Sequence, residues 1–170
     1  GSSSIRLWDL QQDFPSLNTL NLGFGGAFIH SLSNNFENLF QRLQPKAIVL
    51  YLGGNDLTLG LSASEIVEQI RVFVQRIHIK FPSTTIFNVS LKPSFERQEL
   101  LEVIQQINQG MLEVSMQFYY LHQVKLYEAL IDQNQQIRSD VLLQDGLHLN
   151  EQGYQILKAQ IDKALKNHLL

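Results

Sequence analysis

The stretch Ala47–Leu52, AIVLYL, is a run of six apolar residues, and GGND follows it directly at residues 53–56. A short, continuous apolar run is typical of a strand that is buried on both faces, as in the interior of a parallel sheet. Parallel strands need long crossover connections, which are usually helices. The stretch therefore predicts an α/β fold with helices on the faces of a parallel sheet.

The remainder of the chain alternates between strand and helix patterns in the same way. The segment 84–90, TTIFNVS, is rich in β-branched and aromatic residues and predicts a second strand. Ser62 and Glu65 form the pattern of a capping box and predict the start of a helix. Further strands are expected at 17–22 and 118–122, and further helices at 27–43, 95–117 and 151–169, the last with Asn150 as its N-cap.

Strands and helices with short connections predict one parallel sheet that is covered by helices on both faces. No internal repeat, linker or low-complexity segment divides residues 1–170, so a single domain is expected over the whole chain. A chain of 170 residues can bury a sufficient core without disulfides or a structural metal.

Composition excludes several classes of protein and site. The net charge is −3 and no dense Lys/Arg cluster occurs, so nucleic acid is not an expected partner. The chain contains no cysteine, which excludes disulfides, a thiolate nucleophile and a cysteine-based metal site. No apolar run approaches the roughly 18 residues that a membrane span requires, so stable membrane insertion is not expected.

Three polar or glycine-rich clusters follow predicted strands. In an open parallel sheet, ligands and chemistry gather beyond the carboxyl ends of the strands, so these clusters are expected at one edge. Each cluster alone also fits a plain tight turn, and NLGFGG does not complete a dinucleotide-binding GxGxxG pattern because its final position is Phe28. The clusters are Gly23, Gly25 and Gly26; Gly53, Gly54, Asn55 and Asp56; and Asp145 with His148.

The third cluster carries the most specific chemistry. Asp145 lies three residues before His148, and such a carboxylate can orient one imidazole nitrogen while the other acts as a base. Without cysteine, the matching nucleophile is expected to be Ser or Thr on a sharp turn. The first four residues, GSSS, have two interpretations: the remnant of an expression tag, or a nucleophile turn with Gly for the bend and Ser for the chemistry.

In this order, GSSSIRLW, NLGFGGA, LGGNDL and DGLHLNEQGY resemble the four signature blocks of the SGNH (GDSL-type) hydrolases, and the resemblance spans nearly the whole chain. It implies a flavodoxin-like three-layer sandwich with a five-stranded parallel sheet and a serine esterase mechanism without a metal or other cofactor. The SLKPS stretch at 90–94 also resembles a loop of small bacterial members.

The resemblance also implies roles for individual residues. Ser3 matches the nucleophile, His148 the base and Asp145 its orienting carboxylate. Ser3, Gly26 and Asn55 match the positions whose N–H groups form the oxyanion hole. One departure is Ser2, which stands where the first block usually has Asp.

These expectations combine into a hydrolase of carboxylic esters, an esterase or lipase, whose partner is a small-molecule ester. A catalytically silent binding module with the same fold is the alternative, and a homodimer is left open. Short or modest acyl groups are expected. Either Leu57, Leu59 and Leu61 or Phe24 and Phe28 line an acyl groove, or these side chains simply pack.

One expectation concerns what precedes Gly1. In the implied fold the first, central strand feeds directly into the first signature block. That strand is therefore expected before Gly1, as roughly five to ten residues rich in Val, Ile, Leu or Phe. The sequence shows no signal segment, which slightly favours a cytoplasmic location. Because residues are expected before Gly1, the location stays open.

Overall fold

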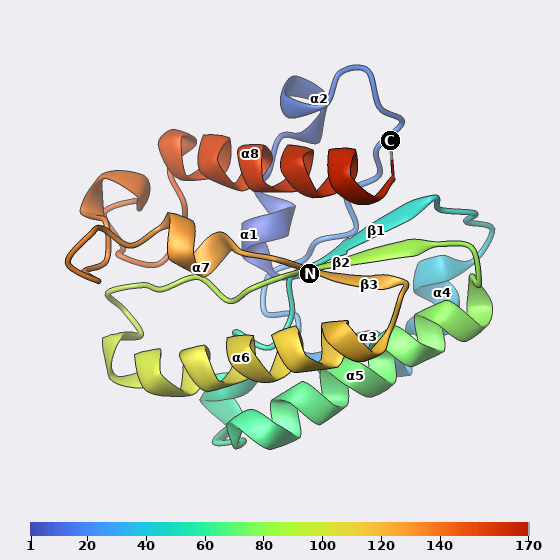
Figure 1. Cartoon of the computed structure of the whole chain (residues 1–170), viewed down its shortest axis with the longest axis horizontal. Helices are drawn as coiled ribbons and strands as arrows, with labels where there is room; N and C mark the ends of the chain where they lie inside the picture. The colour runs from blue at the N-terminus through green and yellow to red at the C-terminus, as the bar shows by residue number, and fades with distance from the viewer. Residues whose placement is uncertain (170) are drawn as a thin grey trace.

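The computed structural model describes residues 1–169 and contains a parallel sheet flanked by helices (Figure 1). The strands within these residues are β1 (Ala47–Leu50), β2 (Thr85–Val89) and β3 (Leu121–Val124), in the spatial order β1-β2-β3. Ile48 pairs with Ile86, and Ile86 pairs with Leu121. The predicted α/β class with a parallel sheet is confirmed.

Helices cover both faces of this sheet. In Figure 1, α8 runs along one side of the strands, and α5 and α6 run along the other. The α-helices are α1 (Ser3–Arg6), α2 (Leu10–Asp13), α3 (Ile29–Asn34), α4 (Phe36–Phe40), α5 (Ala63–Lys80), α6 (Leu101–Gln117), α7 (Leu126–Ala129) and α8 (Glu151–His168). Short 3₁₀ turns are η1 (Asp56–Leu59), η2 (Gln98–Leu100) and η3 (Ser139–Val141).

Local capping explains where the two longest helices start. The Ser62 side chain accepts the N–H of Glu65 while the Glu65 carboxylate accepts the N–H of Ser62, so the predicted capping box is present at α5. The Asn150 side chain accepts the N–H of Gly153 and caps α8, also as predicted. Both helices bury one apolar face against the sheet.

The strand predicted at 17–22 is wrong, because this segment has no β structure. Its polar groups are used elsewhere: the Asn21 amide nitrogen donates to the carbonyls of Ile5 and Trp8, and its oxygen accepts the N–H of Gly23. A strand exists only where a neighbouring backbone pairs with it, and within the described residues none of the strands pairs with 17–22. The LNTLNL pattern alone could not show this.

The strand predicted at 118–122 is displaced, because pairing begins at Leu121 and ends at Val124. A tight turn precedes it, in which the N–H of Leu121 donates to Phe118 O. The Tyr120 ring stacks on His78 at 3.7 Å between ring centroids. The aromatic run thus anchors the turn and does not belong to the strand.

Two predicted helices are shorter than expected. The segment 27–43 contains α3 and α4, which are separated at Asn35. The segment 95–117 becomes α-helical only at Leu101, after the 3₁₀ turn η2. Before that turn, the N–H groups of Phe95 and Glu96 donate to Gly146 O at 2.9 and 3.3 Å, which is a contact with a distant loop.

The buried apolar side chains form one core cluster, and Ile86 and Phe87 on β2 are among its fully buried members. Within the described residues, no helix is long and apolar enough to cross a membrane. The strand expected before Gly1 stays a prediction.

Candidate active site

Three side chains from opposite ends of the chain form a hydrogen-bonded row. Ser3 Oγ lies 2.9 Å from His148 Nε2, although the two residues are 145 positions apart. His148 Nδ1 lies 2.7 Å from Asp145 Oδ2. A hydroxyl, an imidazole and a carboxylate in this order can transfer a proton from the hydroxyl to the imidazole while the carboxylate stabilises the resulting cation.

The turn of residues 145–148, the acid–base turn, is shaped by its own carboxylate. Asp145 Oδ1 accepts the N–H groups of Leu147 and His148, both at 2.9 Å, which leaves Oδ2 for the imidazole. Gly146, which follows Asp145 in this turn, has φ = 65°, a conformation that favours glycine. The hydrogen bond from the His148 ring, and to a smaller extent those from the backbone N–H groups of His148 and Leu147, hold the pKa of Asp145 well below its usual range. The carboxylate is therefore ionised.

Ser3 is the first residue of α1, and the surrounding backbone holds that short helix in place. Tyr154 Oη donates to Ser4 O at 2.8 Å and so connects α1 to α8. Gly23 packs directly on α1, since a Cβ at this position would lie 2.4 Å from Arg6 N. The Gly23 backbone therefore approaches α1 more closely than any side chain would allow.

Two further loops, which contain Gly26 and Asn55, are bonded to each other. Asn55 Nδ2 donates to Ala27 O at 3.0 Å, so the loop after β1 is bonded to the residue that follows Gly26. Gly26 has φ = 65°, and an added Cβ would meet no protein atom within 4 Å. Its left-handed backbone, and not crowding by other protein atoms, is the reason that glycine suits this position.

Asp56 also connects the segments on which these two loops lie. It is fully buried, and its Oδ1 accepts the N–H of Ile29 at 3.1 Å. Burial raises the pKa of Asp56. This buried contact joins the loop after β1 to the first residue of α3.

The structure thus brings Ser3, Asp145 and His148 into one row and bonds the loop of Asn55 to the loop of Gly26. Two further side chains were not identified from the sequence: Lys92 donates to Leu147 O in the acid–base turn, and Arg97 donates to Gly54 O in the loop of Asn55. Of the side chains expected either to line a groove or to pack, Leu57 is buried in the core, while Phe24 and Leu59 are exposed. Leu61 and Phe28 are partly buried.

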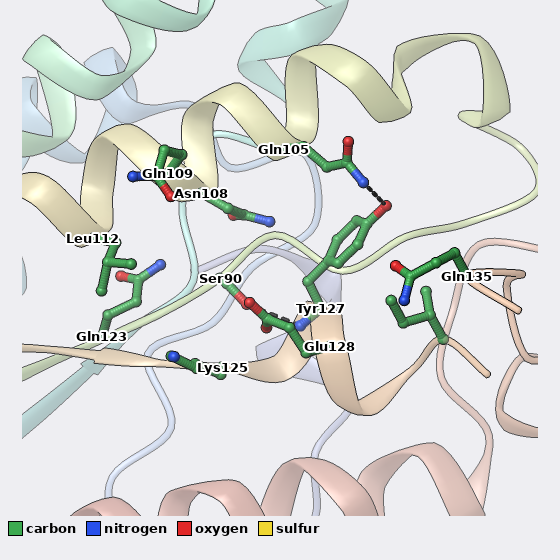
Figure 2. Close-up of a pocket in the computed structure, with 11 residues that line it drawn as sticks. Ser90, Gln105, Asn108, Gln109, Leu112, Gln123, Lys125, Tyr127, Glu128 and Gln135 are labelled. Carbon is green, nitrogen blue, oxygen red and sulfur yellow. Dashed lines mark hydrogen bonds between the residues drawn. The ribbon is translucent and has the colours of Figure 1, made fainter. Parts of the chain in front are cut away.

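A cavity of about 320 Å³ lies elsewhere, between α6 and the segment that follows β3 (Figure 2). None of the predicted site residues lines it, and several of its polar groups are already paired. Gln105 donates to Tyr127 Oη, and the N–H groups of Leu126 and Tyr127 donate to Ser90 Oγ. Within residues 1–169, no group of three or more His, Asp or Glu side chains is arranged to hold a metal ion.

A sequence model of the GDSL-like lipase/acylhydrolase family matches residues 7–156. A curated relative from Acetivibrio thermocellus, named "Putative endoglucanase X", is 30% identical over 127 residues, which cover 74% of this chain and 52% of the relative. The chain therefore spans about half the length of that relative. The matched family stretch begins after Ser3.

Two solved structures share the fold at 26% sequence identity. One is described as "a putative platelet activating factor" from Streptococcus pneumonia, with a TM-score of 0.85 over 97% of this chain and 81% of that chain. The other is a family 3 carbohydrate esterase from Clostridium thermocellum, with a TM-score of 0.68 over 85% of this chain and 68% of that chain.

Proposed function

Because the chain belongs to the GDSL-like lipase/acylhydrolase family, we propose that it hydrolyses carboxylic esters through Ser3, His148 and Asp145. Family membership supports ester hydrolysis in general. The observation that supports these particular residues is the 2.9 Å contact between Ser3 Oγ and His148 Nε2, continued by the 2.7 Å contact to Asp145. The small-molecule ester is the proposed partner, and residues 1–170 form the proposed catalytic domain.

In the proposed mechanism, Ser3 Oγ attacks the acyl carbonyl carbon while His148 Nε2 accepts the hydroxyl proton. Asp145 holds the neutral imidazole in the tautomer with hydrogen on Nδ1 and stabilises the imidazolium that forms. The imidazolium then donates its proton to the departing alcohol. A water molecule, deprotonated by His148, then attacks the acyl carbon of the acyl-enzyme. The bond to Ser3 Oγ breaks, His148 returns the proton to Ser3 Oγ, and the carboxylic acid is released.

The negative charge on the tetrahedral intermediate needs donors that are already in place. We assign this role to the backbone N–H groups of Ser3 and Gly26 and to the Asn55 amide. Asn55 Nδ2 carries two hydrogens, and only one of them is used by Ala27 O, so the second is free for an oxyanion. A neutral amide suits this position, whereas a carboxylate would repel the developing charge.

We further propose short acyl groups on carbohydrate-like alcohols as the first substrates to test. The exposure of the row supports an open site, because the His148 and Asp145 side chains are 24% and 48% exposed. One similar structure is a family 3 carbohydrate esterase, which supports a carbohydrate alcohol. A panel that compares acetylated sugars with lipid esters of increasing acyl length tests this choice.

A fluorophosphonate probe followed by peptide mass spectrometry tests the proposed nucleophile. We expect one equivalent of label on Ser3, and no label in Ser3→Ala or His148→Ala. Ser2→Ala is the matched control, because this neighbouring hydroxyl has no contact with His148, and it should still be labelled on Ser3.

The same experiment separates the proposal from its alternative. A catalytically silent binding module would hydrolyse no ester and would take up no label. Label on a residue other than Ser3, with ester hydrolysis retained in Ser3→Ala, would show that the nucleophile is assigned wrongly.

A further inference from the structure

Two parts of the proposed site are supported by a third segment of the chain. The acid–base turn, residues 145–148, and the loop of residues 53–55 after β1 share no direct hydrogen bond within the part of the chain that the structure describes. Each is instead bonded to residues 92–97, KPSFER, which follow β2. We call residues 92–97 the brace segment.

One end of the brace segment holds the acid–base turn. The Lys92 ammonium donates to Leu147 O, in the middle of the turn, and the N–H groups of Phe95 and Glu96 donate to Gly146 O. The Lys92 residue is only 5% exposed. An ammonium group is costly to bury unless it is compensated, so its place beside the turn indicates a specific use.

The other end contacts the loop of residues 53–55 through Arg97. Arg97 Nη1 donates to Gly54 O at 2.5 Å, and Nη2 lies 3.5 Å from Asn55 Oδ1. The Arg97 side chain is 16% exposed, and its Nε lies 3.3 Å from a Glu96 carboxylate oxygen. The guanidinium is therefore held in a defined orientation by groups on both sides.

This contact and the bond to Ala27 O favour the same orientation of the Asn55 amide. A guanidinium carries only donors, so the amide atom that faces Arg97 must be the oxygen. A backbone carbonyl only accepts, so the atom that faces Ala27 O must be the nitrogen. Together the two contacts place the amide oxygen toward Arg97 and the amide nitrogen toward Ala27, the residue that follows Gly26.

We propose that Arg97 is a positioning residue that orients the Asn55 amide for the oxyanion, and that the brace segment sets the acid–base turn against this loop. The inference rests on the proposed esterase function. It predicts that Arg97 affects catalysis only through Asn55, whereas Lys92 acts through the acid–base turn and independently of Asn55.

The test is a double-mutant cycle on ester hydrolysis with Arg97→Met, Asn55→Ala and the double variant. We expect Arg97→Met to lower kcat by about 10- to 100-fold with KM almost unchanged, since misplacing a reacting group by about 1 Å can cost about 100-fold. In the Asn55→Ala background the same change should cost less than about threefold, because no amide is left to orient.

Three comparisons make the result specific. Arg71→Met, on the surface of α5 and paired with Glu68, is the matched control and should leave kcat unchanged. Arg97→Lys keeps the charge and one donor, so it should fold and should retain part of the lost kcat; it also decides the outcome if Arg97→Met does not fold. Lys92→Met should lower kcat by the same factor with and without Asn55.

Several outcomes would overturn the inference. An Arg97→Met enzyme within about threefold of wild-type kcat would show that Arg97 does not orient the amide. An equal loss of kcat in both backgrounds would show that Arg97 acts by another route. If the wild-type protein neither hydrolyses esters nor takes up the fluorophosphonate, the proposed function fails, and the inference fails with it.

Discussion

Replacing Asn55 tests the proposed oxyanion hole most directly. Asn55→Ala removes the amide whose nitrogen lies 3.0 Å from Ala27 O beside the Gly26 loop. Loss of one such donor typically costs about 100- to 1,000-fold in kcat, or about 2.7–4 kcal/mol of transition-state stabilisation. KM should change little, because the donor acts on charge that exists only in the transition state.

Asn55→Asp should be more damaging, although its shape is nearly the same. The new carboxylate has no donor, and at about 4 Å from the oxyanion it would add about 4 kcal/mol of repulsion at an effective dielectric constant of about 20. Arg97 Nη2 lies 3.5 Å from the Asn55 oxygen and would neutralise part of the new charge. We therefore expect a loss that exceeds that of Asn55→Ala by between about 10- and 1,000-fold.

The assay is steady-state hydrolysis of p-nitrophenyl acetate, with kcat and KM determined separately for wild type and both variants. Thermal unfolding provides the control for folding: the lost bond to Ala27 O should cost only about 1 kcal/mol, or a few degrees in Tm. The reasoning is refuted if Asn55→Ala keeps kcat within a few-fold of wild type, or if Asn55→Asp is the more active variant.

Four further changes have expected outcomes. Asp145→Asn should lower kcat by about 10⁴-fold while the protein stays folded, as measured by hydrolysis and circular dichroism; a loss below about tenfold would contradict its role. Gly23→Ala should destabilise α1, because its Cβ would lie 2.4 Å from Arg6 N; an unchanged urea midpoint would argue otherwise. Burial, and to a smaller extent the charge of Arg97, lowers the pKa of Lys92 to about 8. Between about pH 8 and 10 the unfolded chain therefore binds more protons than the folded chain, so the free energy of unfolding of wild type should rise relative to Lys92→Met by up to about 1.4 kcal/mol per pH unit. Urea titrations at several pH values measure this, and an equal pH dependence of the two proteins would contradict it. Exhaustive chelation should leave ester hydrolysis unchanged, and a loss that added zinc or manganese restores would refute the serine mechanism.

The starts of α5 and α8 were predictable because their determinants are local. Ser62 and Glu65 are three residues apart, as are Asn150 and Gly153, so each cap is closed by residues that are neighbours in the chain. The apolar run at 47–52 correctly indicated a strand, but β1 ends at Leu50, and its first three residues are only partly buried because β1 lies at the edge of the sheet that the described residues form. These features account for the correct α/β class.

The strand predicted at 17–22 shows where pattern reasoning ends. Alternating leucines permit a strand, but a strand forms only if another backbone pairs with it. Among the residues that the structure describes, no strand pairs with 17–22, which no property of the segment itself could reveal.

The candidate site divides in the same way. The sequence by itself determined the chemical groups: a serine on a glycine turn, an aspartate three residues before a histidine, and an asparagine after a buried strand. Only the tertiary structure brought Ser3 within 2.9 Å of His148 and placed Lys92 and Arg97 against the two loops. The physical reason is range: spacing along the chain specifies contacts within a turn or two, whereas a contact between residues 145 positions apart depends on how the whole core packs.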